Sequence, residues 1–148
     1  MVDAVHIFEL KEADELYVNP IRELLAQLSS SQMDFTVDTL KELVDAPNVH
    51  LFVATCGERM CGMLTLAHYA APTGRKLWIE DVVVDSSLRG KSIGRSLVQY
   101  AVERAKEIGG TLMLTSKPAR VAANALYRSS GFEQKETNVY RMKVCPHI

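Results

Sequence analysis

Hydrophobic positions in the first third of the chain predict one strand followed by two helices. Residues 2–10 alternate loosely between apolar and polar side chains, which is typical of a strand. Residues 13–29 carry apolar side chains at helical spacing, and Pro20 starts or kinks the second part of this helix. Its buried stripe is predicted to be Leu16, Ile21, Leu24, Leu25 and Leu28. A second helix follows Thr36, a suitable cap, with Val37, Leu40 and Val44 on one face and Pro47 after its end.

The middle of the chain predicts a meander of three strands. Two apolar runs surround Gly57 and Gly62 between residues 49 and 70, which indicates a hairpin. A turn at 71–76 leads into "LWIEDVVVD", 77–85, the third strand of the meander.

The rest of the chain predicts alternating helices and strands. A helix is expected over 92–108, ended by Gly109 and Gly110, with a buried stripe of Ile93, Leu97, Ala101, Ala105 and Ile108. A short buried strand is expected over 111–116. A helix is then expected in 118–132, with Pro118 near its first position and Gly131 past its end. Residues 133–144 are predicted to close the chain as a strand, with a hairpin around Asn138 as the alternative.

This order, β-α-α-β-β-β-α-β-α-β, predicts an α+β fold with a mixed, largely antiparallel sheet flanked by helices. The 148 residues and the absence of a linker indicate a single domain, 1–148. A net charge of −1 argues against nucleic acid as a partner. Because no apolar run reaches the length of a membrane span and the first residues lack a basic region, we expect neither a membrane segment nor a signal peptide.

Three cysteines, an odd number, favour a reducing compartment, and we expect the protein to be cytoplasmic. Cys56 and Cys61 flank a predicted turn. A metal site would need more ligands at suitable spacing, so no metal is expected, and a regulatory disulfide between these two residues is the alternative to ordinary thiols.

Candidate chemistry begins at "RGKSIGR", residues 89–95, where a strand passes into a helix. The N-terminus of a helix presents unpaired N–H groups and partial positive charge, and glycines let a ligand approach the backbone. Arg89, Lys91 and Arg95 add full charges beside Gly90 and Gly94. The pattern favours a phosphate site, although a well-capped turn with solvated charges would look the same.

The same residues, taken with the order of elements, resemble the GNAT superfamily of acetyl-CoA-dependent N-acetyltransferases. The signature of that family, [RQ]-x-x-G-x-[GA], cradles the pyrophosphate of acetyl-CoA with backbone amides. The matching positions are Arg89, Gly90, Lys91, Ser92, Ile93 and Gly94. Ser92 stands where the first signature glycine is usual, and its N–H keeps the anion contact if the local φ is negative.

Two further segments carry the resemblance. "NALYRSSGF", 124–132, is similar to a helix of the family in which an Asn bonds the cofactor and a Tyr points at its sulfur, which implies those roles for Asn124 and Tyr127. Arg120, spaced i, i+4, i+7 with these two, should share their helix face. "IEDVVVD", 79–85, is similar to a strand of glucosamine-6-phosphate N-acetyltransferases. In the family this strand separates from its neighbour and its free amides hold the acetyl and pantetheine groups, which implies that Val82, Val83 and Val84 lie along the cofactor.

The expected reaction is direct attack of a small-molecule primary amine on acetyl-CoA. An alkylammonium must first lose a proton, and Glu80, Asp81 or a water relay can take it. Because successive strand residues point to opposite faces, both carboxylates reach the substrate only if the strand is distorted, and we favour Glu80. A backbone N–H near Val82 would stabilise the oxyanion, and Tyr127 would return a proton to the leaving thiolate.

The acceptor pocket should involve the first two helices, the loop 29–35 and the closing strands. Glu23, Asp34 or Asp38 could attract an ammonium group there, but we favour ordinary surface acids. Three alternatives remain open. One is a protein lysine or N-terminal acetyltransferase, the second is a CoA-binding sensor or interaction module without catalysis, and the third is an α+β scaffold without a ligand. The resemblance also implies a possible homodimer.

Overall fold

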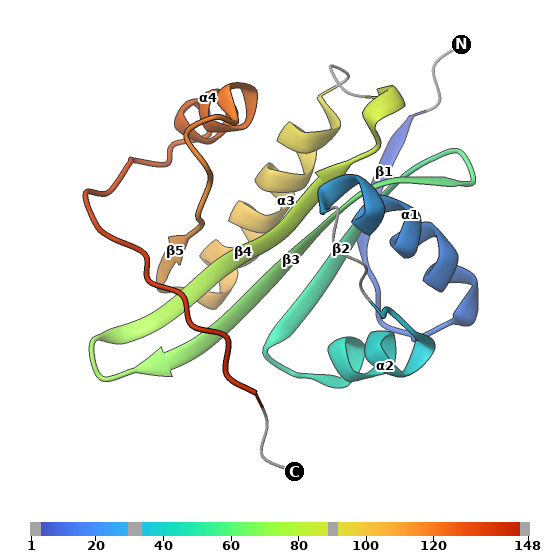
Figure 1. Cartoon of the computed structure of the whole chain (residues 1–148), viewed down its shortest axis with the longest axis horizontal. Helices are drawn as coiled ribbons and strands as arrows, with labels where there is room; N and C mark the ends of the chain where they lie inside the picture. The colour runs from blue at the N-terminus through green and yellow to red at the C-terminus, as the bar shows by residue number, and fades with distance from the viewer. Residues whose placement is uncertain (1–3, 30–33, 89–91, 146–148) are drawn as a thin grey trace. The chain divides into compact units, whose positions relative to one another are not determined.

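The computed structural model describes residues 4–29, 34–88 and 92–145. The chain divides into two compact units, Met1–Thr115 and Ser116–Ile148. The first unit contains a five-stranded sheet in the order β1-β2-β3-β4-β5, drawn in Figure 1. Its strands are β1 (Val5–Glu9), β2 (Val49–Cys56), β3 (Arg59–Ala71), β4 (Gly74–Val84) and β5 (Thr111–Met113). The first four pair antiparallel and β5 pairs parallel with β4, so the predicted mixed sheet is confirmed.

Helices α1 (Val18–Leu28) and α2 (Val37–Asp45) cover one face of this sheet, and α3 (Ile93–Ile108) covers the other (Figure 1). The face below α1 and α2, here called the front face, holds a core that includes Leu51, Val53, Met63 and Val83 with Leu24 and Leu40 of the helices. The opposite, rear face packs Phe52, Leu64, Leu66, Leu77 and Ile79 with Ile93, Leu97, Val98 and Ala101 of α3. Gly62 lies in β3 directly below α3, where an added Cβ would come 3.0 Å from Leu97 Cδ1.

The predicted helix 13–29 is divided at Val18. A short 3₁₀ turn, η1 (Glu15–Tyr17), comes first, and Asp14 Oδ1 accepts a hydrogen bond from the Leu16 N–H at its start. The break changes the phase of the apolar pattern, so Leu16 is 81% exposed and its predicted burial is wrong. Val18, Ile21 and Leu24 form the buried side of α1 instead.

Capping residues end the helices where the sequence predicts it. The Thr36 hydroxyl accepts a hydrogen bond from the Thr39 N–H and starts α2. Gly109, at φ 84°, closes α3, and Gly131, at φ 101°, follows the end of α4 (Val121–Ser129). The start of α4 differs from the prediction. Pro118 lies three residues before the helix, and Arg120 is its non-helical N-cap, so Arg120 does not lie on the helix face.

The second unit contains α4 and the chain that follows it. The predicted closing strand over 133–144 is wrong, because the described residues there form no strand. Val139, Tyr140, Met142 and Val144 are all more than 70% exposed. An alternating pattern becomes a strand only when another strand supplies its hydrogen-bond partners, and the sequence pattern cannot show whether one is present.

Candidate functional site

A β-bulge distorts β4 at the two acidic residues that the sequence singles out. Glu80 pairs with Thr65 and Val83 pairs with Met63, so Asp81 and Val82 together face Leu64 alone. Asp81 takes a left-handed conformation, φ 50°, which Asp tolerates better than most residues. The bulge also reverses the side-chain alternation: Ile79 points to the rear core and Val83 to the front core. This is the distortion that two adjacent functional carboxylates would require.

Glu80 belongs to the front face, in register with Thr65 and two residues from Trp78. Both Glu80 and Asp81 are exposed, where an undistorted strand would bury one of them. Desolvation, and then the nearby Asp81 charge, raise the pKa of Glu80 above its usual value. A carboxylate with a raised pKa is a stronger proton acceptor than an ordinary surface acid.

The strand β4 separates from β5 just before the bulge. The parallel pairing covers only Lys76 to Trp78 with Thr111 to Met113. From Ile79 to Val84, the edge of β4 on the β5 side therefore has no ladder partner among the described residues. Free backbone N–H and C=O groups at a strand edge can bind an extended polar ligand. Val83 is not part of this free edge, because it pairs with Met63 of β3 in the same phase as Asp85, whose N–H donates to the Cys61 carbonyl, and its side chain is buried in the front core. Val82 and Val84 are half-buried.

The first turn of α3 presents backbone N–H groups. Ser92 is its N-cap and gives no side-chain capping bond, so the amides of Ile93, Gly94 and Arg95 lack an intrahelical acceptor. Ile93 contributes only its amide because its side chain is buried, and Arg95 is exposed. The condition placed on Ser92 is not met: its φ is +63°, in the left-handed region that glycine normally occupies. Arg89, Gly90 and Lys91 lie outside the described residues.

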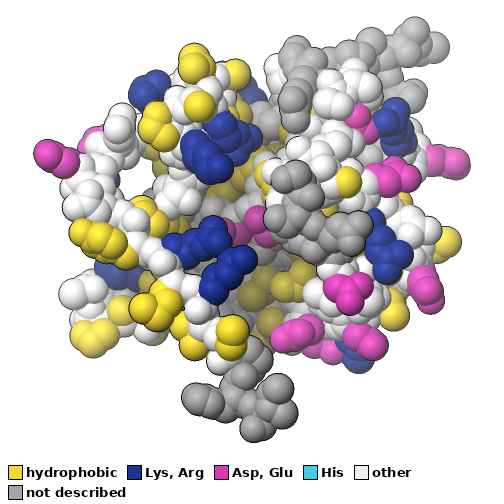
Figure 2. Space-filling view, in the orientation of Figure 1, with side chains coloured by type: hydrophobic (Ala, Val, Ile, Leu, Met, Phe, Trp, Pro, Cys, Tyr) yellow, Lys and Arg dark blue, Asp and Glu magenta, His cyan; other side chains and the backbone are white. Residues whose placement is uncertain are grey.

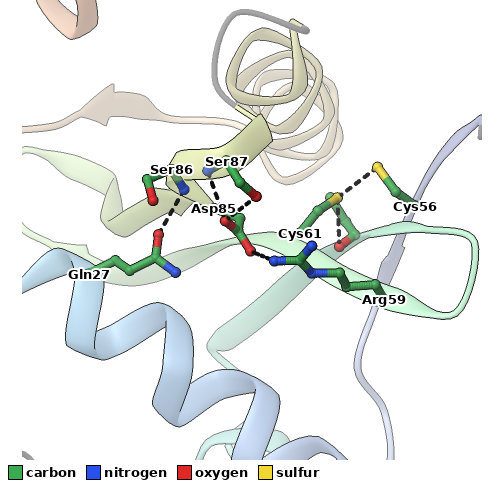
Figure 3. Close-up of polar contacts among 8 residues, drawn as sticks. Gln27, Cys56, Arg59, Cys61, Asp85, Ser86 and Ser87 are labelled. Atoms are coloured by element: carbon green, nitrogen blue, oxygen red, sulfur yellow. Dashed lines mark hydrogen bonds and ion pairs between the residues drawn. The ribbon is translucent and has the colours of Figure 1, made fainter. Parts of the chain in front are cut away.

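The loop that leaves β4 is fixed by Asp85, a residue that the sequence reasoning did not select. Asp85 is buried, and its Oδ1 accepts hydrogen bonds from the Ser87 N–H at 3.0 Å and the Ser87 hydroxyl at 2.8 Å (Figure 3). Its Oδ2 forms an ion pair with Arg59, the first residue of β3. The hydrogen bonds from Ser87, followed by the Arg59 charge, lower the pKa of Asp85. The signal in the sequence was an Asp followed by two serines at the end of a strand.

A second anchor joins this loop to α1. The side-chain oxygen of Gln27 accepts a hydrogen bond from the Ser86 N–H at 2.7 Å (Figure 3). The Asp85 N–H donates to the Cys61 carbonyl at 2.8 Å, which continues the contact with β3. The segment Asp85 to Ser87 is therefore held on both sides by side chains and backbone.

Cys56 and Cys61 are free thiols with their Sγ atoms 3.2 Å apart beside this loop (Figure 3). Burial, with the neighbouring Cys56 second, raises the pKa of Cys61 to about 12. A thiol with so high a pKa is a poor nucleophile at neutral pH. Among the residues that the structure describes, no cluster of His, Cys, Asp and Glu is arranged to hold a metal ion.

Asn124 and Tyr127 lie on α4 in the second unit. The Asn124 side-chain amide nitrogen donates to the Lys117 carbonyl at 2.9 Å, which does not use the acceptor capacity of the side-chain oxygen. Tyr127 is buried, with its ring edge-on to Phe132 at 6.1 Å. Burial raises the pKa of Tyr127 above its usual value, so its hydroxyl keeps its proton at neutral pH.

The acidic residues near the first two helices are surface residues. Glu23, Asp34 and Asp38 are exposed. Figure 2 shows acidic side chains gathered over α2, where Asp38, Glu42 and Asp45 face solvent with Lys41. Lys41 pairs with Asp45 at 2.7 Å. Part of the loop 29–35 lies outside the described residues.

A bulged strand beside a free edge and an uncapped helix start form the arrangement expected from the sequence resemblance. Residues 14–132 match the family described as Acetyltransferase (GNAT) family. The chain belongs to this family. It is an N-acetyltransferase, and the family uses acetyl-CoA as its acyl donor.

The chain is similar to proteins with different descriptions. An aminoalkylphosphonate N-acetyltransferase from Salmonella typhimurium is 27% identical over 140 residues, 89% of each chain. A solved structure described as a transcriptional regulator from Bacillus halodurans is 31% identical, covers 95% of this chain and 100% of its own, and has a TM-score of 0.74. Glucosamine-6-phosphate N-acetyltransferase from Arabidopsis thaliana has a TM-score of 0.79 at 21% identity, and the match covers 95% of this chain and 99% of that chain.

Among the described residues no helix has the length and apolar character to span a bilayer.

Proposed function

We propose that this acetyltransferase transfers the acetyl group of acetyl-CoA to the primary amine of a small molecule. The observation that carries the proposal is the bulge in β4, which leaves Glu80, with its raised pKa, next to the strand edge that β5 has left free. The amine substrate named for the Salmonella relative supports a small acceptor. The family match runs from residue 14 to 132, across both compact units, and supports one catalytic domain over 1–148.

Several groups of the chain support acetyl-CoA as the donor in this proposal. The backbone groups of Val82 and Val84 would bind the extended pantetheine arm, while Val83, paired with Met63 of β3, would hold the strand between them. The uncapped amides of Ile93, Gly94 and Arg95, with the Arg95 charge, would hold the pyrophosphate, joined by Arg89, Gly90, Lys91 and Ser92 of the motif. The Asn124 oxygen would accept a hydrogen bond from an amide of the cofactor. When bound, acetyl-CoA supplies an activated thioester.

Glu80 is assigned the role of base. Its raised pKa suits it to take a proton from the alkylammonium form of the acceptor, directly or through a water. Asp81, in the left-handed position of the bulge, is the rival base and also increases the basicity of Glu80 by its charge. Tyr127, protonated at neutral pH, is assigned to donate a proton to the leaving sulfur.

A CoA-binding sensor is the second candidate. The likeness to the Bacillus halodurans protein described as a transcriptional regulator favours it. The two functions differ in turnover: a sensor would bind acetyl-CoA without acetylating any amine. Acetylation of protein lysines or N-termini, a homodimer and a cytoplasmic location remain predictions from the sequence.

Calorimetric titration with acetyl-CoA, with dephospho-CoA and ATP as comparison ligands, tests the donor site. One-site saturable binding is expected, and Gly94→Glu should abolish it because the new carboxylate would occupy and repel the pyrophosphate position. A folded Gly94→Glu protein with unchanged affinity would refute this placement of the phosphates.

A turnover assay with a small-amine panel and a lysine-peptide panel then tests the acceptor. Release of the CoA thiol with small amines, and not with peptides, is the expected result. Binding of acetyl-CoA without turnover on either panel would support the sensor and refute the proposed reaction.

A further inference from the structure

Glu80, Trp78 and Tyr69 form a row on the part of the front face that the helices leave open. Trp78 lies two residues before Glu80 on β4, in register with Ala67 of β3, and Tyr69 is two residues beyond Ala67. Alternate residues of paired strands share a face, so all three side chains project from the same side of the sheet. The covered part of this face, with Leu51, Val53 and Met63, is fully buried. The three residues of the row extend the same face of the sheet beyond the helices, where Glu80 and Tyr69 are exposed and Trp78 is half-buried.

Tyr69 and Trp78 act as one aromatic surface. They are a diagonal cross-strand pair, and the Trp78 indole N–H donates a hydrogen bond to the Tyr69 hydroxyl at 3.4 Å. Tyr69 is 50% exposed and Trp78 is half-buried. The register partner of Trp78 is Ala67, whose methyl group covers little of an indole ring. The indole is thus held in place by a polar contact while much of the pair stays uncovered.

We propose that this Tyr69–Trp78 surface is the subsite for the body of the acceptor, and that the acceptor is a primary amine that carries a ring. The inference rests on the proposed function, because Glu80 marks the position of the amine. Two residues along a strand span about 7 Å. A ring joined to the amine by one or two carbons therefore reaches the indole while its nitrogen stays beside Glu80.

The chemistry of the surface selects rings over open chains. A flat or saturated ring covers an indole over a large area and loses little conformational freedom, because it is already rigid. An open-chain amine of similar size covers less of the indole and must be ordered on binding. The expected preference for ring-bearing amines is about tenfold in kcat/KM.

The test is a comparison of kcat/KM for 2-phenylethylamine and cyclohexylmethylamine with that for propylamine, at saturating acetyl-CoA. The two ring probes distinguish an aromatic from a saturated ring. Trp78→Ala should lower the ratio of ring-bearing to open-chain amine by at least about fivefold. Trp78→Phe, which keeps a ring, should restore most of the preference, and Tyr69→Ala should reduce it. Thermal melting of each variant shows whether it is folded.

The outcomes separate this inference from the proposed function. If the wild type acetylates all three amines without preference, or if Trp78→Ala leaves the ratio unchanged, the aromatic subsite is wrong and the amine acetyltransferase stands. If the wild type binds acetyl-CoA and acetylates none of the probes or the wider panel, both proposals fall. If Trp78→Ala does not fold, the test compares the ratio of kcat/KM for ring-bearing and open-chain amines in Trp78→Phe with that in Tyr69→Ala. A higher ratio in Trp78→Phe is expected, and equal ratios in the two variants would overturn the subsite.

Discussion

The Nε2 atoms of His50 and His68 lie 3.3 Å apart on the rear face of the sheet, and their outer partners determine the direction of the hydrogen bond between them. Arg75 can only donate, so its Nη1 gives a proton to Nδ1 of His68 at 3.2 Å. His68 then carries its proton on Nε2 and donates it to Nε2 of His50. The remaining proton of His50, on Nδ1, is donated to Glu9 Oε2 at 2.8 Å.

This chain of hydrogen bonds ends at Arg104 of α3. The other oxygen of Glu9 accepts a hydrogen bond from Arg104 at 2.6 Å, and Arg104 also lies over the Phe52 ring and within 3.6 Å of Glu107. Burial alone would raise the pKa of Glu9, but the hydrogen bonds from His50 and Arg104 outweigh it and lower the pKa. The network connects four strands to α3, and every proton in it has an acceptor only when both histidines are neutral.

Acid should weaken the fold through this pair. Burial, then the charges of His50 and Arg75, lower the pKa of His68 below its usual value. A base with a depressed folded pKa binds its proton more readily when unfolded, so its stabilisation is complete above about pH 6.5 and is lost as the pH falls through the folded pKa. Urea denaturation from pH 8 to pH 5 should show this fall, and Glu9 should add a further loss only below about pH 4.5.

His68→Phe should flatten this pH dependence, while the matched control His6→Ala, an exposed histidine on β1, should keep it. If the free energy of unfolding of His68→Phe falls with pH as steeply as that of the wild type, the histidine pair does not cause the loss of stability in acid.

The sequence predicts correctly those features that depend on a few neighbouring residues, and it fails for those that depend on packing between distant segments. Thr36, Gly109 and Gly131 end or begin helices as predicted, because a cap acts within one turn. The Glu80–Asp81 pair was selected, and the need for a distortion was recognised, but the bulge itself depends on the register with β3. The burial of Leu16 and the closing strand over 133–144 were wrong, because helix phase and strand pairing depend on packing that no short pattern contains.

Ser92→Gly should stabilise the protein. Ser92 holds φ +63°, which costs a residue with a Cβ about 1–2 kcal/mol, and glycine removes this cost while adding less than about 1 kcal/mol of unfolded-state entropy. The expected gain is up to about 1 kcal/mol in the free energy of unfolding. Ser92→Ala should have a free energy of unfolding near that of the wild type, because the hydroxyl makes no capping bond. Ser96→Gly, inside the helix, should lower the free energy of unfolding by about 1 kcal/mol. A loss for Ser92→Gly in urea denaturation would contradict the strain.

Asp85 should contribute more to stability through Ser87 than through Arg59. Arg59 has a side chain that is 62% exposed, so its ion pair is screened and Arg59→Ala should cost less than about 1 kcal/mol. Asp85→Ala removes the acceptor for both Ser87 hydrogen bonds from a buried position and should cost about 1–3 kcal/mol. Chemical denaturation of both variants measures the difference, and equal losses would assign the stabilisation to the ion pair instead.

Glu80→Gln should lower turnover by about 10²–10⁴-fold, because the amide cannot accept the proton. In the pH profile of kcat/KM, activity should rise as Glu80 ionises. Because the pKa of Glu80 is raised, this rise should lie above the usual carboxyl range of about pH 4.5. Asp81→Asn is the matched variant. It should retain most of the activity and shift this rise to lower pH, because it removes the charge that opposes ionisation of Glu80. A larger loss in Asp81→Asn than in Glu80→Gln would exchange their roles.

Tyr127→Phe should reduce turnover and leave acetyl-CoA binding intact. The substitution removes the hydroxyl and its proton but keeps the ring that packs edge-on to Phe132, so α4 should remain folded. Because the pKa of Tyr127 is raised, the wild-type hydroxyl holds its proton throughout the neutral range, and loss of a general acid of this kind lowers kcat by about 10²-fold or more. Single-turnover kinetics with an accepted amine, set beside the calorimetric Kd for acetyl-CoA, separate the two effects. Equal kcat in the variant and the wild type would remove Tyr127 from the reaction, whereas a weakened Kd with unchanged kcat would make it a binding residue.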